Sequence, residues 1–300
     1  AYKTLRKEIK MKKLNFKAIA VALTAALTLG LAGCSSSGNS STADSSATAG
    51  NSTSVAESSA EGDQSLQKVK DAGQFILGLD ATFKPMGYTD ENGEIVGFDI
   101  DVAEEVCNRL GVKLVKQPIN WDTLTTDLNV GKCDCIWNGL SINEERQEKM
   151  NLSEPYMKNT MVFVVKGDST VAKMDDLKGK KVSVQNGSSA QTILENSAIK
   201  DDITISPIAT NVEALQQLEL GVVDAVFLDE VVADYEIKNS AKDYKKLAEG
   251  LEEEQYAIAF RKNDQALRDE VQKILSEMKA DGKLGDISTK WFGSDITIVK

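Results

Sequence analysis

The folded part of this 300-residue chain is predicted to be an α/β protein with two similar lobes. Short apolar runs alternate with amphipathic segments from about residue 66 onward, which is typical of strands that alternate with helices. In addition, residues 128–137 (LNVGKCDCIW) match residues 218–227 (LELGVVDAVF), and each copy has the pattern of a helix end, a glycine and a buried strand. Two copies are too few for a solenoid, which needs at least three. They indicate two lobes, with a chance likeness between two ordinary turns as the alternative.

Local patterns predict the individual elements. Residues 75–79 form a short apolar run that predicts a buried strand, and residues 99–110 predict a helix with Gly111 just past its end. The further elements are expected in this order: a strand at 112–115, a helix around 121–130, a strand at 133–137, a strand, glycine turn and helix start within 182–189, and closing helices within 264–293. Cys133 and Cys135 are two apart on an expected strand, so they should point to the same buried face.

The composition excludes several classes of function. The chain has no histidine, which removes histidine-based general-base catalysis and most zinc sites. With 35 basic and 46 acidic residues the formal net charge is -11, and such a surface disfavours nucleic acid, whose binding needs clustered Lys and Arg. We therefore predict no nucleic-acid partner, no metal site and no cofactor.

The first 33 residues have the pattern of a targeting segment. They hold seven Lys and Arg and one acid, so the rest of the chain has a net charge of -17. Residues 18–33 are apolar or small apart from two threonines, and this run is shorter than the roughly 20 residues that a membrane-spanning helix needs. It ends in Leu31-Ala32-Gly33-Cys34, which resembles the lipobox of bacterial lipoproteins. A lipoprotein signal peptide is predicted at 11–33, with lipidation of Cys34; a buried apolar helix with a chance cysteine is the alternative.

The next segment, residues 34–65, is dominated by Ser, Thr, Ala, Gly and Asn. It has almost nothing to bury, so we expect a disordered tether. A lipid followed by a tether implies that the folded body works near a membrane surface, and the predicted location is extracytoplasmic, anchored to the outer face of the cell membrane.

Polar side chains follow the two strands of the echoed segments. Asn138, Gly139 and Ser141 come just past the first expected strand, and Asp229 comes just past the second. Ligands of open α/β sheets bind beyond the carboxyl ends of the strands. If the two lobes face one another, these groups meet in one cleft.

Candidate groups for a free amino acid, which carries a carboxylate and an ammonium on one carbon, are also present. The planar fork of Arg146 suits a carboxylate, and Asp229 suits an ammonium. Ser188 and Ser189 stand at an expected helix start, where free N–H groups favour an anion. A surface charge for Arg146 or Asp229, and a plain helix cap for the serines, are the alternatives.

The body resembles the polar amino acid-binding proteins of ABC importers (family 3 extracellular solute-binding proteins). Gly97-Phe98-Asp99-Ile100-Asp101-Val102 is similar to that family's signature of glycine, aromatic and alternating acids before a helix. Five further segments resemble its ligand loops and interlobe crossover in the same order, and the likeness runs from about residue 70 to 293: 80–85, 139–146, 153–156, 187–189 and 229–230.

The resemblance implies a two-lobed type II periplasmic binding protein fold. Each lobe would be a mixed sheet flanked by helices, and two crossover strands near 156–162 and 254–259 would join them. Lobe one would comprise residues 66–157 plus 257–300, and lobe two would comprise residues 160–255.

The resemblance also implies roles for the candidate residues. Arg146 would bind the α-carboxylate with the N–H groups of Ser141 and Ser189. Asp229 would bind the α-ammonium, together with the Ser141 hydroxyl and the Gly139 carbonyl. The remaining ligand-binding candidates are Phe83 and Trp121 as apolar walls (ordinary core packing is the alternative), Asp80, Asn138 and Gln185 facing the ligand side chain, and Ser188 beside Ser189.

The implied function is that of a substrate-binding lipoprotein without enzyme activity. It would bind a polar amino acid (glutamine, a basic amino acid or cystine) by lobe closure and deliver it, as a monomer, to the permease subunits of an ABC transporter. Two alternatives are a dehydratase of small cyclic acids on the same fold and a sensory module that reports an amino acid.

Overall fold

The structure is a computed structural model that describes residues 62–300. The predicted signal peptide, Cys34 and nearly all of the predicted tether lie outside the described residues. Helix α1 (Ser65–Ala72) includes the last residue that was assigned to the tether. None of the helices between residues 62 and 300 is both long enough and apolar enough to cross a membrane.

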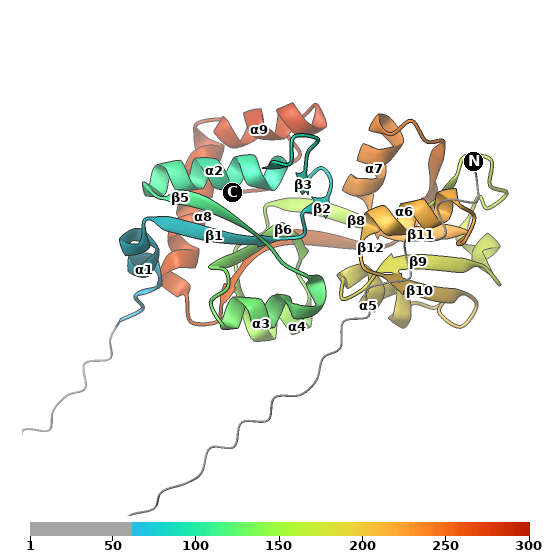
Figure 1. Cartoon of the computed structure of the whole chain (residues 1–300), viewed down its shortest axis with the longest axis horizontal. Coiled ribbons are helices and arrows are strands. Elements are labelled where there is room, and N and C mark those ends of the chain that lie inside the picture. The colour runs from blue at the N-terminus through green and yellow to red at the C-terminus, as the bar shows by residue number, and fades with distance from the viewer. Residues whose placement is uncertain (1–61) are drawn as a thin grey trace, which may run out of the picture. The chain divides into compact units, whose positions relative to one another are not determined.

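A single nine-stranded mixed sheet runs through the whole body (Figure 1). Its strands, in spatial order, are β10 (Thr204–Ile208), β9 (Lys181–Gln185), β11 (Ala225–Asp229), β8 (Met157–Lys166), β12 (Tyr244–Arg261), β6 (Cys135–Ser141), β1 (Gln74–Leu79) and β5 (Lys113–Pro118), with β7 (Met150–Leu152) beside β12. A small second sheet consists of β2 (Thr82–Phe83), β3 (Gly87–Thr89) and β4 (Ile95–Val96). Parallel strands lie at both ends of the large sheet, and the long strands β8 and β12 are antiparallel to each other in its middle.

Helices cover both faces of the sheet in each half. Lobe one denotes the half with β1, β5 and β6, and its helices are α1, α2 (Phe98–Leu110), α3 (Leu124–Asn129), α4 (Glu144–Lys149), α8 (Gln265–Ala280) and α9 (Lys283–Phe292). Lobe two denotes the half with β9, β10 and β11, and its helices are α5 (Ser189–Asn196), α6 (Asn211–Glu219) and α7 (Glu230–Asn239). Two 3-10 turns, at Trp121–Thr123 and Met174–Leu177, complete the helical segments. Figure 1 shows α2 and α9 on one face of lobe one and α3 and α4 on the other.

The chain passes between the lobes on β8 and β12. Strand β12 pairs with β8 from Tyr244 to Tyr256, and from Tyr256 onward it pairs with β6 and β7 of lobe one. The two crossings therefore lie side by side, in the segments where the sequence placed them. The lobe boundaries at 66–157 plus 257–300, and at 160–255, stay a prediction.

The echoed segments have the same local structure in both lobes. In each copy a helix ends before a glycine with positive φ (77° and 67°), and a buried strand follows. The carboxylate of Asp134 accepts a hydrogen bond from the backbone N–H of Ile76 at 2.9 Å, and the carboxylate of Asp224 accepts one from Lys181 N–H at 2.9 Å. Each aspartate thus bonds to the backbone of the neighbouring parallel strand, which explains why both copies keep it.

Helix α2 shows how local sequence sets an element. Asp99 and Asp101 lie in its first turn, where the helix dipole favours negative charge, and Gly111 ends it in the left-handed conformation at φ 74°. Gly97 precedes it with its Cα against the backbone of Met86, where a Cβ would lie 2.2 Å from the carbonyl oxygen. Glycine is the residue that permits this close approach.

The expectation for β6 needs two corrections. The strand starts at Cys135 and continues to Ser141. Asn138, Gly139 and Ser141 therefore lie within the strand rather than beyond its end. The prediction that Cys133 and Cys135 share a face is wrong, because Cys133 precedes the strand. Cys135 packs in the core that contains Cys107, whereas Cys133 packs in the core beneath α3. All three thiols are free and buried, and burial raises the pKa of each.

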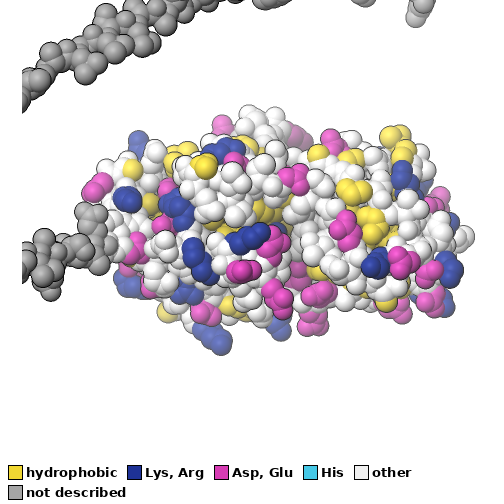
Figure 2. Space-filling view, turned by 90° about the horizontal axis from the view of Figure 1, so that it is seen from below, with side chains coloured by type: hydrophobic (Ala, Val, Ile, Leu, Met, Phe, Trp, Pro, Cys, Tyr) yellow, Lys and Arg dark blue, Asp and Glu magenta, His cyan; other side chains and the backbone are white. Residues whose placement is uncertain are grey.

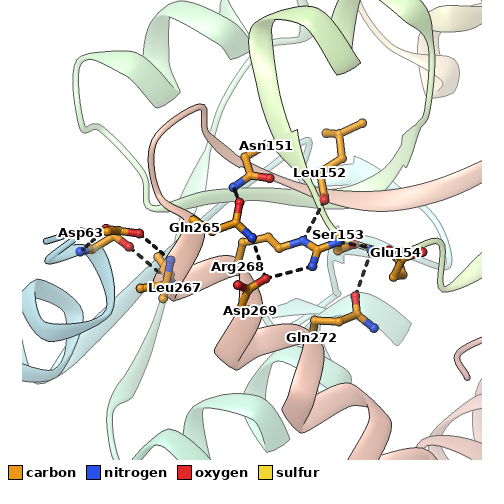
Figure 3. Close-up of polar contacts among 12 residues, drawn as sticks. Asp63, Asn151, Leu152, Ser153, Glu154, Gln265, Leu267, Arg268, Asp269 and Gln272 are labelled. Atoms are coloured by element: carbon orange, nitrogen blue, oxygen red, sulfur yellow. Dashed lines mark hydrogen bonds and ion pairs between the residues drawn. The ribbon is translucent and has the colours of Figure 1, made fainter.

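The C-terminal helices return to lobe one through a set of polar contacts (Figure 3). Arg268 of α8 donates to the carbonyl of Leu152 at 2.9 Å, and Gln272 accepts from Glu154 N–H at 2.9 Å. One face of α8 is an apolar stripe whose five residues are all buried: Leu267, Val271, Ile274, Leu275 and Met278. On the face that Figure 2 shows, acidic and basic side chains are interspersed.

Candidate ligand-binding site

A small, partly open cavity of about 10 Å³ lies where the two lobes meet. Its lining consists of Phe83, Trp121, Gly139 and Arg146 from lobe one, and Gln185, Ser188, Ser189 and Asp229 from lobe two. All eight are among the eleven residues that the sequence nominated. The other three, Asp80, Asn138 and Ser141, lie directly behind the lining and hydrogen-bond to it or to each other.

Arg146 brings a buried cation to the cavity. It lies on α4, whose cap is the side chain of Asn143, and it is 7% exposed. Its Nη1 donates to the backbone carbonyl of Ser141 at 2.7 Å, and its guanidinium lies 5.4 Å from the centre of the Trp121 ring. Burial lowers the pKa of Arg146 to about 10, while nearby carboxylates act in the opposite direction. The side chain therefore remains a cation at neutral pH.

Asp229 brings a buried carboxylate to the same cavity from the other lobe. It is the last residue of β11 and is 7% exposed. One of its oxygens accepts hydrogen bonds from Asn159 Nδ2 at 2.9 Å and from Tyr256 Oη at 2.5 Å. Burial, followed by the negative charge of Glu254, raises the pKa of Asp229 to about 7. A cation placed beside this carboxylate would favour its ionised form.

Two serine hydroxyls connect the lobes behind Arg146. Ser189 Oγ donates to Ser141 Oγ at 3.1 Å, and Ser141 Oγ donates to Glu254 Oε2 at 2.9 Å. Ser188 next to it caps α5, because its hydroxyl accepts from Gln191 N–H at 3.2 Å. The simple cap interpretation thus holds for the Ser188 hydroxyl, whereas Ser189 reaches across the junction.

A polar group lies at the other side of the cavity. Gln185 Nε2 donates to Asp80 Oδ2 at 2.7 Å, which joins the end of β9 to the loop after β1. Asn138 was expected to face the ligand side chain, but its amide oxygen accepts from Asp80 N–H at 3.1 Å and it is fully buried beneath the loop. Asn138 thus positions Asp80, and of these three residues Gln185 is the one that lines the cavity.

Gly139 occupies a position in which a side chain would not fit. Its φ is 58°, and a Cβ would lie 2.9 Å from Phe83 Cε1 and 3.2 Å from Tyr256 Cε2. Its N–H donates to Asp99 Oδ2 at 2.8 Å, and Tyr156 Oη donates to the same oxygen at 3.1 Å. Asp99 is completely buried, and burial raises its pKa to about 7.

Three residues of this network were missed by the sequence analysis: Glu254, Tyr256 and Asn159, all on the crossover strands. A signal for two of them was present, because strand alternation extends from Ile258 back through Tyr256 to Glu254 on one face. The run Glu252-Glu253-Glu254 instead has the pattern of a solvated edge. Asn159 has no local signal, since its neighbours on both sides are polar.

Comparison with known proteins finds a matching family. The sequence profile of the bacterial extracellular solute-binding proteins, family 3, matches residues 75–294. The L-cystine-binding protein TcyJ of Escherichia coli (strain K12) is 30% identical over 234 residues, which cover 77% of this chain and 87% of that protein.

Two solved structures share the fold. One is an ABC uptake transporter substrate binding protein from Streptococcus pneumoniae with bound histidine. The two sequences are 36% identical and the TM-score is 0.76, and the match covers 79% of this chain and 98% of that one. The other is Tv2483 bound to L-arginine: identity 30%, TM-score 0.76, with the same coverage of 79% and 98%. These similarities confirm the predicted two-lobed type II periplasmic binding fold, and the matched proteins are binding proteins rather than enzymes.

Proposed function

This chain belongs to the bacterial extracellular solute-binding proteins, family 3, and from that premise we propose that it binds a free polar amino acid by lobe closure and delivers it to the permease subunits of an ABC transporter. The observation that carries the proposal is the pair Arg146 and Asp229. A buried cation and a buried carboxylate line one cavity from opposite lobes. Buried charges are unfavourable unless they are paired, and the zwitterionic end of an amino acid pairs both.

The anion side of the cavity is suited to an α-carboxylate. Apart from the bond to Ser141, the guanidinium N–H groups of Arg146 donate to no acceptor among the described residues. A guanidinium can hold a carboxylate through two parallel hydrogen bonds. The first turn of α5 begins at Ser189, and its free N–H groups favour the same anion.

The far side of the cavity is suited to a polar or cationic side chain. The carboxylate of Asp80 hydrogen-bonds to Gln185, while Phe83 and Trp121 offer flat apolar surface. The matched proteins bind cystine, histidine or arginine according to their names. Glutamine, a basic amino acid or cystine fits this combination in our proposal.

The placement of the contacts supports lobe closure. The pairs Gln185–Asp80 and Ser189–Ser141 each join one lobe to the other around the cavity. A ligand that contacts both lobes binds the closed arrangement better than the open one, which is what shifts the population toward closure. The closed shape is then the form that a permease recognises.

The site of action in this proposal is the outer face of the cell membrane. The lipobox-like sequence ending at Cys34 and the polar segment 34–65 support a lipid anchor followed by a tether. The bacterial modification adds at least two acyl chains, and two chains give stable attachment where one gives marginal binding. Incorporation of labelled palmitate into the wild-type chain, and its loss in Cys34→Ala, tests the anchor. Light scattering of the purified chain tests the proposed monomer.

Calorimetry tests the ligand class. The purified chain is titrated with each of the standard amino acids and with cystine, and saturable binding of at least one polar member is expected. The decarboxylated and deaminated analogues of that amino acid should bind far more weakly, because each leaves Arg146 or Asp229 unpaired. Absence of binding by all of them, or equal binding of the analogues, contradicts the proposal.

A further inference from the structure

Glu254 is a buried carboxylate at the crossing between the lobes. It lies on β12 and is 9% exposed, whereas Glu252, Glu253 and Gln255 beside it are exposed. Taking a carboxylate out of water is unfavourable unless hydrogen bonds or cations compensate. The partners of Glu254 therefore indicate what its burial achieves.

Those partners connect three parts of the molecule. Ser141 Oγ of lobe one donates to Glu254 Oε2 at 2.9 Å, and Asn159 Nδ2 of β8 lies 3.3 Å from the same oxygen. Ser189 Oγ of lobe two donates to Ser141 Oγ at 3.1 Å. A chain of oxygens thus runs from a crossover strand through lobe one to the first residue of α5 in lobe two.

The same carboxylate is also joined to the ammonium side of the site. The Nδ2 group of Asn159 that approaches Glu254 also donates to Asp229 Oδ1 at 2.9 Å. The charge of Glu254 acts on both Arg146 and Asp229 and alters the pKa of each. Glu254 does not line the cavity itself, so it acts on a ligand through Ser141 and Asn159 and through its charge near Arg146 and Asp229.

We propose that Glu254 is a positioning residue that orients the Ser141 hydroxyl, holds Ser189 and the start of α5 beside Arg146, and so keeps the lobes closed on the bound amino acid. This inference rests on the proposed function. A serine hydroxyl has one hydrogen. While Glu254 accepts the hydrogen of Ser141, the lone pairs of Ser141 remain available to Ser189. Without that acceptor the Ser141 hydroxyl is free to rotate, and the bond between the lobes loses its fixed geometry.

Three variants of the purified full-length chain test the role. Glu254→Ala removes the acceptor, Glu254→Gln keeps an acceptor oxygen of the same reach, and Glu253→Ala is the matched control on the exposed face of the same strand. The ligand is the amino acid that binds the wild-type chain, with Kd from calorimetry and koff from stopped-flow displacement. Glu254→Ala should raise Kd roughly 10- to 100-fold, as expected for a disrupted buried hydrogen-bond network, and most of the change should lie in koff because the lobes must open for release.

The conservative variant separates positioning from general destabilisation. Glu254→Gln should restore Kd and koff to within about threefold of wild type, since the hydrogen bond rather than the charge does the positioning. Glu253→Ala should leave both constants unchanged. Equal Kd and koff in Glu254→Ala and Glu253→Ala, or a Glu254→Gln variant as weak as Glu254→Ala, overturns the proposal.

Failure of the proposed function would be recognised separately. A wild-type chain that binds no tested amino acid overturns the function, and in that case small-angle scattering of the ligand-free proteins tests Glu254. Glu254→Ala should then have a larger radius of gyration than wild type and Glu254→Gln. Identical scattering curves for the three proteins would overturn the role of Glu254 as well.

Discussion

Gly187 of lobe two lies directly against Asp122 of lobe one, so closely that a Cβ on Gly187 would be 2.6 Å from Asp122 Oδ1 and 2.8 Å from its backbone nitrogen. The neighbouring Asn186 donates to both carboxylate oxygens of Asp122, at 2.8 and 2.7 Å. This contact lies outside the lining of the cavity. It is therefore a feature of the closed arrangement that a ligand does not provide.

A methyl group at this contact should oppose closure. Gly187→Ala is expected to weaken ligand binding by roughly tenfold or more, because the backbone of the other lobe has to move away. The positive φ of the new alanine adds a conformational cost of about 1–2 kcal/mol to the folded protein. Gly179→Ala is the matched control: its φ of 74° is close to the 70° of Gly187, and no atom lies within 4 Å of its Cβ position. Calorimetric Kd values for the two variants should differ; equal values would contradict an interlobe role for Gly187.

Removal of the guanidinium should abolish most of the affinity. Arg146→Ala leaves a ligand carboxylate buried without a partner, and loss of one member of such a pair typically costs about 2–5 kcal/mol, or at least ~30-fold in Kd. Arg146→Lys should recover little, because an ammonium lacks the planar fork. Arg109→Ala, which removes a partly exposed guanidinium bonded to Glu105 and Asp281, is the control and should bind normally. Normal binding by Arg146→Ala would exclude it as the carboxylate anchor.

Ligand affinity should decrease as the pH falls below 7. The pKa of Asp229 is raised to about 7 by burial and by the charge of Glu254, so at lower pH the free protein holds a proton that a bound ammonium must displace. Kd should then rise by up to about tenfold per pH unit, with proton release that calorimetry in two buffers can detect.

The variant Asp229→Asn isolates this effect. It should bind weakly at every pH, with a nearly flat profile between pH 5 and about 7, because its side chain no longer titrates. Asp201→Asn, at an exposed position of lobe two, should keep the wild-type profile. A steep profile that persists in Asp229→Asn would assign the titration to another group.

The buried Asp99 should make folding less favourable as the pH rises. Its pKa is raised from 3.8 to about 7 by burial, so between about pH 4 and 7 the folded state binds more protons than the unfolded state. This contribution to the free energy of unfolding decreases as the pH rises through that range and is constant above it. In urea unfolding, the free energy of unfolding of Asp99→Asn should decrease less between pH 4 and 7 than that of wild type. Asp71→Asn on α1 is the control and should behave like wild type. Parallel pH profiles for wild type and Asp99→Asn would contradict the effect.

Asp80 should select among ligands by charge. Asp80→Asn keeps the hydrogen-bonding shape but removes a carboxylate that faces Gln185. Affinity for arginine, lysine or histidine should therefore fall more than affinity for glutamine, because only the cationic side chains lose the attraction of the carboxylate behind Gln185. Competition titrations on wild type and variant measure the ratio of the affinity for each cationic amino acid to the affinity for glutamine. An equal change for all ligands would show that Asp80 does not determine selectivity.

Much of the site followed from local patterns in the sequence. The strand ends pointed to Ser141 and Asp229, and the glycine turn before α5 pointed to Ser188 and Ser189. These four residues line or adjoin the cavity. Period-two and period-3.6 patterns carry such information because they fix which end of an element a residue occupies. The β6 strand was predicted too short, since its last residues are polar or glycine and buried by tertiary contacts rather than by their own hydrophobicity.

By itself the sequence determined the two-lobed architecture, the order of strands and helices, and the cation and carboxylate that face each other across the lobes. Only the tertiary structure decided that Glu254 is buried, that Asn138 hydrogen-bonds to Asp80, and that Cys133 and Cys135 pack in different cores. Glu254 meets Ser141 across 113 residues of chain, and Asn138 meets Asp80 across 58. The physical reason is that burial of a polar side chain depends on partners brought by other segments, and no local periodicity records which distant residue will supply the hydrogen bond.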